Sequence, residues 1–177
     1  MLPTSKLMTL KEAIFTCVED GDLIGTGGLS FWRKPMSACR EMVRQVKKEL
    51  TICTFVGGLD VDMLIAGGCI SEVRASFVGM EVFGMAPHYR HAIETREVKI
   101  REESEATIAG GLKCNYLDIP FFPLKGIIGT DFPKVREDLV QFADPLGSGT
   151  QLMAMPKIDL DVAVVHVNYC DEYGNAN

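Results

Sequence analysis

The sequence lacks the marks of several protein classes. Its six cysteines are scattered and include no Cys-x-x-Cys pair, which argues against a zinc site or a disulfide framework and favours buried thiols in a reducing compartment. No apolar run reaches the roughly 18 residues that a membrane span requires, and the N-terminus has no signal-peptide pattern. Acidic residues outnumber basic ones, with 24 Asp and Glu against 18 Lys and Arg. We therefore expect a cytoplasmic protein with neither a nucleic-acid nor a membrane partner.

The chain has enough apolar residues to form one ordinary domain over residues 1–177, since 47% of them are hydrophobic. Stretches typical of strands alternate with stretches typical of helices. The expected strands are 23–26, 50–56, 72–79, 97–102 and 160–168, with short extended pieces at 119–124 and 151–156 and with helices that begin near residues 10, 35, 60, 86 and 104. This alternation predicts an α/β fold with an open, mainly parallel sheet, helices on both of its faces, and ligands at the carboxyl ends of its strands.

Two stretches stand outside this alternation. Residues 126–150 are rich in Gly, Pro and Asp, and we expect an irregular segment there that can serve as an active-site loop. The strand at 160–168, whose apolar residues predict burial, is followed only by a short loop and by no covering helix. We therefore expect the chain to be incomplete at its C-terminal end or to be completed by another chain.

The stretch GDLIGTGGLSFWRKP, residues 21–35, places glycines directly after the first expected strand. It is no Rossmann fingerprint, because Ser30 occupies the third glycine position, and it lacks the Gly-Lys-Ser/Thr of a P-loop. One interpretation is a simple turn between a strand and a helix. The other is that the backbone N–H groups of Gly27, Gly28 and Leu29 face an anion or a carbonyl oxygen.

Several charged and titratable side chains also have two interpretations. Arg33 and Lys34 follow the glycines and fit a phosphate-bearing ligand, although cations ahead of a helix are also typical of a solvated surface. His88 and His91 share one helix face at a spacing that permits metal binding, but no second pair of ligands accompanies them, so no metal site is expected. His166 lies in an apolar strand, which is typical of a core histidine.

Residues 20–35 resemble the N-terminal signature of family I CoA-transferase α-subunits. The positions that match are Asp20, Gly21, Gly27, Gly28 and Pro35. The stretch departs from the signature at Leu29, where Phe is usual, and at Arg33, where many members have Gly. The Arg-Lys-Pro variant and the stretches DVDMLIAGG, IPFFPL, MPKIDLDVAVVHVN and DEYGNA resemble the glutaconate CoA-transferase branch, so the resemblance covers nearly the whole chain.

This resemblance implies one subunit of a hetero-oligomer that acts on acyl-CoA and carboxylate substrates, with a coenzyme A thioester as substrate and no permanently bound cofactor. In such transferases a glutamate on the β-type chain attacks the thioester. The present sequence has no counterpart of the Ser-Glu-Asn-Gly motif that carries that glutamate. The glycine turn would then supply an oxyanion or CoA-facing wall. Gly174 and Asn175 match the family's Gly-Asn after the last strand, where a ligand is expected.

Glu105, at the start of an expected helix, leaves other functions open. It is either a solvated carboxylate favoured by the helix dipole or a general base in a partly apolar pocket. The steroid-ring-opening CoA hydrolases, a related branch that the chain also resembles, rely on a glutamate at this position, which implies hydrolysis in place of transfer. The short C-terminus also leaves open an inactive binding or scaffold chain.

Overall fold

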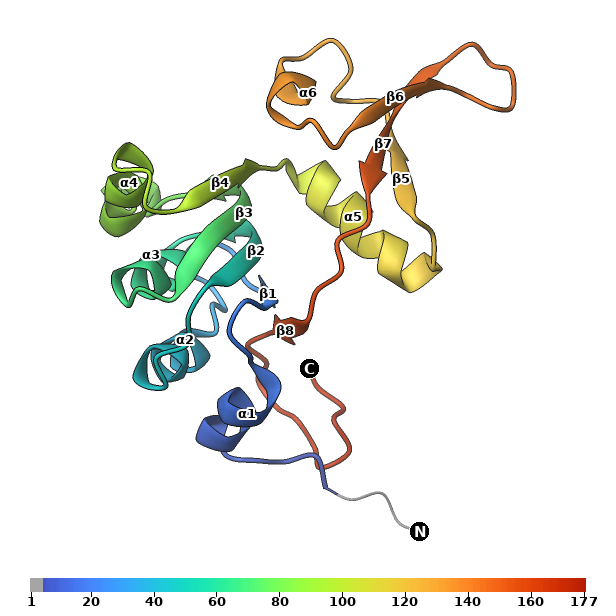
Figure 1. Cartoon of the computed structure of the whole chain (residues 1–177). Helices are drawn as coiled ribbons and strands as arrows, with labels where there is room; N and C mark the ends of the chain where they lie inside the picture. The colour runs from blue at the N-terminus through green and yellow to red at the C-terminus, as the bar shows by residue number, and fades with distance from the viewer. Residues whose placement is uncertain (1–4) are drawn as a thin grey trace.

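The computed structural model describes residues 5–177, which form two sheets connected by a long helix (Figure 1). The larger sheet has five strands in the order β4-β3-β2-β1-β8, and every neighbouring pair in it is parallel. Its strands are β1 (Leu23–Thr26), β2 (Leu50–Gly57), β3 (Ile70–Val78), β4 (Lys99–Glu102) and β8 (Val162–Val164). The predicted open, mainly parallel α/β sheet is confirmed.

Helices cover both faces of this sheet, as predicted. They are α1 (Leu10–Cys17), α2 (Met36–Arg44), α3 (Leu59–Ala66), α4 (Pro87–Glu94) and α5 (Glu105–Leu117). The first four share one core with the sheet, and α5 packs on the opposite face. Successive strand residues point to opposite faces, so Ile24 joins the core under α1–α4 while Leu23 joins the core beside α5. None of the helices within residues 5–177 combines the length and the apolar character that a membrane span requires.

Local hydrogen bonds explain where α1 and α5 begin. At α1, Thr9 Oγ1 accepts from the Glu12 N–H at 3.2 Å and the Glu12 carboxylate accepts from the Thr9 N–H at 3.0 Å. At α5, Ser104 Oγ accepts from the Thr107 N–H at 3.1 Å and Thr107 Oγ1 accepts from the Ser104 N–H at 2.8 Å. Each pair of hydrogen bonds forms a capping box, which satisfies two backbone N–H groups that have no partner within the helix. Because α5 begins directly after β4 ends, its start lies at the carboxyl end of β4, at the edge of the sheet where ligands are expected.

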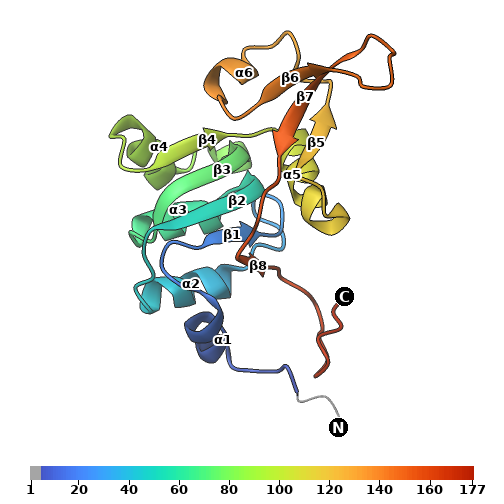
Figure 2. The same cartoon turned by 45° about the vertical axis from the view of Figure 1, so that its right-hand side comes forward.

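The outer side of α5 carries a smaller antiparallel sheet in the order β5-β7-β6 (Figure 2). Its strands are β5 (Phe121–Leu124), β6 (Val140–Ala143) and β7 (Gln151–Pro156), and the short helix α6 (Phe132–Val135) precedes β6. The prediction of irregular structure over 126–150 is therefore wrong for α6 and β6. Because three of the four residues of β6 are exposed, the strand has no buried face to produce an apolar pattern.

The last strand is shorter and more exposed than predicted. Only Val162–Val164 pair with β1, and the centre of this segment, Ala163, is exposed. His166 follows the strand and is exposed, so its prediction as a core histidine is wrong. The physical reason is topology: β8 lies at the edge of the sheet, where β1 is its one strand neighbour among residues 5–177.

Candidate active site

The glycine turn follows β1 at the carboxyl edge of the parallel sheet, where α/β folds place ligands. Gly28 has a φ of +87°, and a Cβ added there would lie 2.5 Å from the carbonyl oxygens of Trp32 and Arg33. Leu29 and Trp32 bridge each other in antiparallel fashion, so the chain doubles back next to Gly28. Only glycine permits this approach of backbone to backbone.

The backbone amides of the turn are mostly used within the protein. The Gly27 N–H donates to the Val164 carbonyl at 3.0 Å, and the Leu29 N–H donates to the Trp32 carbonyl at 2.9 Å. The prediction that these two amides face a ligand is therefore wrong, because pairing with β8 and the tight bend consume them. The Gly28 N–H has no acceptor among residues 5–177, and it is the one of the three that remains available.

Lys34, at the end of the turn, is almost wholly buried. Its Nζ lies 3.0 Å from Asp60 Oδ2 and donates to Thr54 Oγ1 at 3.0 Å. Asp60 also accepts from Thr26 Oγ1 at 2.9 Å and from the Gly58 N–H at 2.9 Å. The predictions of a phosphate contact or a solvated charge are therefore both wrong for Lys34. Its ammonium group ties the turn to β2 and to the start of α3.

Two buried thiols in this part of the fold, Cys39 beside the ion pair and Cys53 on β2, are unsuited to nucleophilic attack. Burial raises the pKa of Cys39 to about 12, and the Asp60 carboxylate adds to the increase. Burial likewise raises the pKa of Cys53 to about 11. Both thiols are therefore protonated near neutral pH, and the thiolate is the reactive form.

A cavity of about 560 Å³ lies between the turn, the start of α2 and the chain after β8. Arg33, Arg40 and His166 line it and are all exposed. Lys34 lines it too, but its ammonium is committed to Asp60. Arg33 and Lys34 are the two cations predicted to meet a phosphate-bearing ligand, and of these Arg33 is the one with an accessible charged group.

A second cavity, of about 200 Å³, lies on the opposite face of the sheet, between β1, β2, β8 and α5. Gly27 and Cys53 line it from the sheet, Ile108 and Leu112 line it from α5, and Ala163 lines it from β8. Within residues 5–177, no charged residue belongs to its wall. Because Gly27 is part of the turn, the cavity reaches the carboxyl edge of the sheet, and Gly28 is the next residue along the chain.

Glu105 is the first residue of α5, and its side chain is exposed. At 3.6 residues per turn, Glu105 shares a helix face with Ile108 and Leu112, which line the 200 Å³ cavity. Its carboxylate therefore lies about one helical turn from the cavity wall. The exposure also means that this chain alone does not desolvate the carboxylate as an apolar pocket would.

Glu103, which no sequence pattern separates from its acidic neighbours, is wholly buried. Its carboxylate lies 2.7 Å from Arg74 Nη2 and 2.7 Å from Arg136 Nη1, and it accepts from Thr107 Oγ1 at 2.6 Å. Arg74 is on β3 and Arg136 follows α6, so these contacts join the two sheets. The sequence signal for this network is a pair of cations, Lys134 and Arg136, in a segment otherwise rich in Gly, Pro and Asp.

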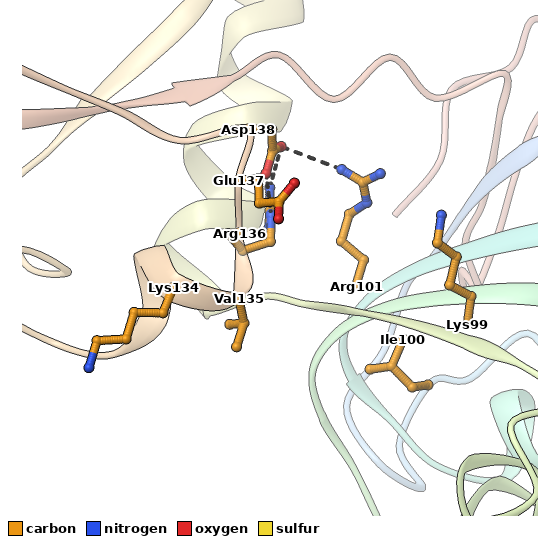
Figure 3. Close-up of a pocket in the computed structure, with 8 residues that line it drawn as sticks. All are labelled: Lys99, Ile100, Arg101, Lys134, Val135, Arg136, Glu137 and Asp138. Atoms are coloured by element: carbon orange, nitrogen blue, oxygen red, sulfur yellow. Dashed lines mark hydrogen bonds and ion pairs between the residues drawn. The ribbon is translucent and has the colours of Figure 1, made fainter.

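Figure 3 shows a further cavity, of about 330 Å³, beside this ion network and between β4 and the segment around α6. Arg136 Nε donates to Asp138 Oδ1 at 2.7 Å, and Arg101 Nη1 lies 3.4 Å from Asp138 Oδ2. The hydrogen bonds from Arg136 lower the pKa of Asp138. These cations are already paired with acids, so the cavity is a junction between the sheets and a poor anion site.

The C-terminal turn holds its own polar groups. Asp171 accepts from the backbone N–H of Asn175 at 2.9 Å and from Asn175 Nδ2 at 2.7 Å. Gly174 has a φ of +89°, which suits the turn. Both predicted site residues are exposed, and the local hydrogen bonds account for the turn without a ligand.

The two histidines predicted to share a helix face lie on α4, and each is close to a carboxylate of this chain. His88 Nδ1 lies 2.9 Å from Asp62 Oδ2, and Asp62 Oδ1 accepts from the N–H groups of His88 and Tyr89 at 2.7 and 3.0 Å. His91 Nε2 lies 3.9 Å from Glu97. In the described part of the chain, no group of three or more His, Cys, Asp or Glu side chains is arranged to hold a metal ion.

Known proteins share both the sequence and the architecture. The model of the Coenzyme A transferase family matches residues 7–177. A 3-oxoadipate CoA-transferase subunit of Pseudomonas knackmussii is 32% identical over 97% of this chain and 61% of that protein. The cholesterol ring-cleaving hydrolase IpdA subunit of Rhodococcus jostii is 30% identical over 97% of this chain and 59% of that protein. The chain thus spans less than two thirds of the length of these two relatives.

Solved structures agree with these relatives. A variant of the decarboxylase AibA/AibB has a TM-score of 0.91 at 25% identity, over 99% of this chain and 67% of that chain. Glutaconate coenzyme A-transferase from Acidaminococcus fermentans has a TM-score of 0.85 at 27% identity, over 97% of this chain and 59% of that chain. The resemblance to glutaconate CoA-transferases and to ring-cleaving hydrolases is confirmed, and the chain belongs to the Coenzyme A transferase family.

Proposed function

We propose that this chain is the α-subunit part of a hetero-oligomeric CoA-transferase, which moves CoA between an acyl-CoA thioester and a carboxylic acid. A β-type partner chain supplies the nucleophilic glutamate. The observation that carries the proposal is the Gly28 amide, which has no acceptor among residues 5–177 and directly follows Gly27, a residue of the uncharged cavity wall. Such a site offers a hydrogen-bond donor and room for an acyl group, but no carboxylate to attack it.

In this reaction the partner's glutamate attacks the thioester carbonyl, and the Gly28 N–H stabilises the negative charge that develops on the carbonyl oxygen. The C–S bond then breaks, which releases CoA thiolate and leaves an acyl-glutamyl anhydride. The thiolate attacks the glutamyl carbonyl, so that a glutamyl-CoA thioester forms and the first acid leaves as a carboxylate. The second carboxylate takes up CoA by the same two steps in reverse.

The anionic part of CoA binds at the 560 Å³ cavity in this proposal. Arg33 provides the accessible guanidinium there, while Lys34 holds the turn through Asp60. Gly174 and Asn175, in the exposed turn after β8, are further candidates for contact with CoA. CoA thioester is a substrate, no cofactor stays bound, and the complex works in the cytoplasm.

The test is to coexpress the chain with its β-type partner and to incubate the complex with acyl-CoA. Hydroxylamine should trap an acyl-glutamate on the partner and none on this chain. Arg33→Ala should raise the KM for acyl-CoA about tenfold, because a hydrogen bond to a charged group contributes roughly 1.5 kcal/mol or more. Arg90→Ala, which removes an exposed α4 arginine paired with Glu94, is the control and should leave KM unchanged. Turnover without any acyl group on the partner would exclude transfer.

A second function, thioester or carbon–carbon hydrolysis, is favoured by the position of Glu105. The exposed carboxylate shares a helix face with Ile108 and Leu112 of the 200 Å³ cavity. In a complex that closes over it, Glu105 would take a proton from water as the water attacks the substrate. Glu105→Gln should then abolish hydrolysis while acyl-CoA binding persists, and Glu102→Gln, a nearby exposed carboxylate, should change neither. Undiminished turnover by Glu105→Gln would rule this function out.

A further inference from the structure

The 200 Å³ cavity presents an apolar wall to the space beside the glycine turn. Ile108 and Leu112 form its α5 side, and Leu160 and Val165 flank β8. Cys53 contributes a thiol whose pKa burial raises to about 11, so it is neutral near pH 7. A group that enters this cavity therefore meets hydrocarbon and a neutral sulfur.

Thr26 and Thr54 belong to the same wall, but their hydroxyl groups point to the opposite face of the sheet, because these residues follow Ile24 and Ile52 by two positions. Thr54 Oγ1 accepts from Lys34 Nζ at 3.0 Å and donates to the Thr26 carbonyl at 3.2 Å. Thr26 Oγ1 donates to Asp60 Oδ2 at 2.9 Å. Lys34 and Asp60 pair with each other and with these threonines outside the cavity, and no described residue of its wall carries a charge, so the wall offers no cation to a ligand carboxylate.

We infer that this cavity receives the acyl group of the thioester, and that this acyl group is uncharged and apolar, with about four to six carbon atoms. The inference rests on the proposed function, which brings the thioester carbonyl to the Gly28 amide. At about 30 Å³ for each group the size of a water molecule, 200 Å³ holds roughly six to seven such groups. A carboxylate at the far end of the acyl chain would lose its water there and gain no counter-charge.

The test compares pentanoyl-CoA with glutaryl-CoA, which have five acyl carbons each and differ by the terminal carboxylate. Calorimetry on the complex of this chain with its β-type partner should show pentanoyl-CoA binding at least tenfold more tightly. Acetyl-CoA should bind roughly 60-fold more weakly than pentanoyl-CoA, because each of three buried methylene groups contributes about fourfold. Equal or tighter binding of glutaryl-CoA would overturn the inference.

Two variants locate the preference in this cavity. Leu112→Lys places an ammonium in the wall and should shift the preference at least tenfold toward glutaryl-CoA. Leu117→Lys, at an exposed position at the end of the same helix, is the control and should leave the ranking unchanged. Should Leu112→Lys fail to fold, Ala163→Leu on the exposed edge strand still fills the cavity, and it should weaken pentanoyl-CoA binding without weakening acetyl-CoA binding.

The results separate this inference from the proposed function. Preferential binding of pentanoyl-CoA without CoA transfer would reject transfer and support the apolar acyl site. Transfer with no preference between pentanoyl-CoA and glutaryl-CoA, or a preference that neither variant alters, would reject the inference alone. Failure to bind any acyl-CoA would reject both.

Discussion

The two ends of the candidate site use buried charge differently. At the glycine turn, the Lys34–Asp60 pair joins the end of the turn to the start of α3, close to Thr26 of β1 and Thr54 of β2. At the start of α5, Glu103 pairs with Arg74 of β3 and with Arg136, which belongs to the segment between α6 and β6. The first network shapes a local turn, whereas the second holds the small sheet against the large one.

In both networks, charged residues that are close in sequence differ in exposure. Lys34 is buried while Arg33 beside it is exposed, and Glu103 is buried while Glu105 is exposed. A buried charge is tolerated only with a partner and further hydrogen bonds. The residue that meets an opposite charge within the fold is therefore structural, and its neighbour stays free to meet a substrate.

Breaking the network between the sheets should have the largest effect. Glu103→Gln removes the charge that faces Arg74 and Arg136, whose side chains are only 12% and 2% exposed. The free energy of unfolding should fall by about 3–5 kcal/mol, because two buried guanidinium groups lose a counter-charge. Urea denaturation measures this change, and the exposed Glu102→Gln should shift it by less than about 0.5 kcal/mol. A loss below about 1 kcal/mol for Glu103→Gln would show that this carboxylate does not hold the sheets together.

Breaking the local network should cost somewhat less. Asp60→Asn keeps an acceptor for the Gly58 N–H but leaves Lys34 with Thr54 as its remaining partner, so we expect a loss of about 3 kcal/mol. Amide hydrogen exchange should also quicken at Leu29, whose N–H lies in the turn. Asp62→Asn is the matched control, since Asn caps a helix about as well as Asp, and it should cost less than about 1 kcal/mol. If amide exchange at Leu29 is unchanged in Asp60→Asn, the ion pair does not stabilise the turn.

A change in the turn itself should have an intermediate effect on stability and a large one on activity. In Gly28→Ala the new Cβ meets two backbone carbonyl oxygens at 2.5 Å, so the turn must shift, at a cost of about 2 kcal/mol. CoA transfer by the complex should fall at least 100-fold if the Gly28 N–H faces the oxyanion as proposed, because that N–H moves. Gly21→Ala is the control: its φ is also positive, at +91°, but its Cβ would meet nothing within 4 Å. Gly21→Ala should lose about 1 kcal/mol of stability and keep its transfer rate.

Much of the large sheet was predictable because apolar runs and turn signals coincide. The first strand, Leu23–Thr26, is bounded by glycine-containing turns and agrees with its prediction to the residue. The α5 helix is marked by Ser104, and its start is off by only one position. By contrast, β6 exposes most of its side chains, and β8 is exposed because of its place in the strand order, which no local pattern encodes.

The candidate site was predictable in position but not in detail. The sequence places the glycine turn and Glu105 at strand ends, and both lie at the carboxyl edge. Which amides and cations remain free depends on partners far along the chain, such as Val164 for the Gly27 amide and Asp60 for Lys34. Those partners meet only when the sheet has formed, so the local pattern around Lys34 indicates a surface position.

The smallest expected effect concerns the exposed rim of the network between the sheets. Asp138 is about one third exposed, and hydrogen bonds from Arg136 lower its pKa. A carboxylate whose folded pKa lies below its unfolded value stabilises the fold above the unfolded pKa of about 3.9, and this stabilisation is lost as the pH falls through the folded pKa. Asp138→Asn should therefore cost up to about 1 kcal/mol at pH 7 and progressively less below pH 4. Urea denaturation at a series of pH values measures the difference, with Asp131→Asn, an exposed carboxylate of the same segment, as control. A difference that stays constant from pH 7 to pH 2.5 would show that the Asp138 charge plays no part in holding the two sheets together.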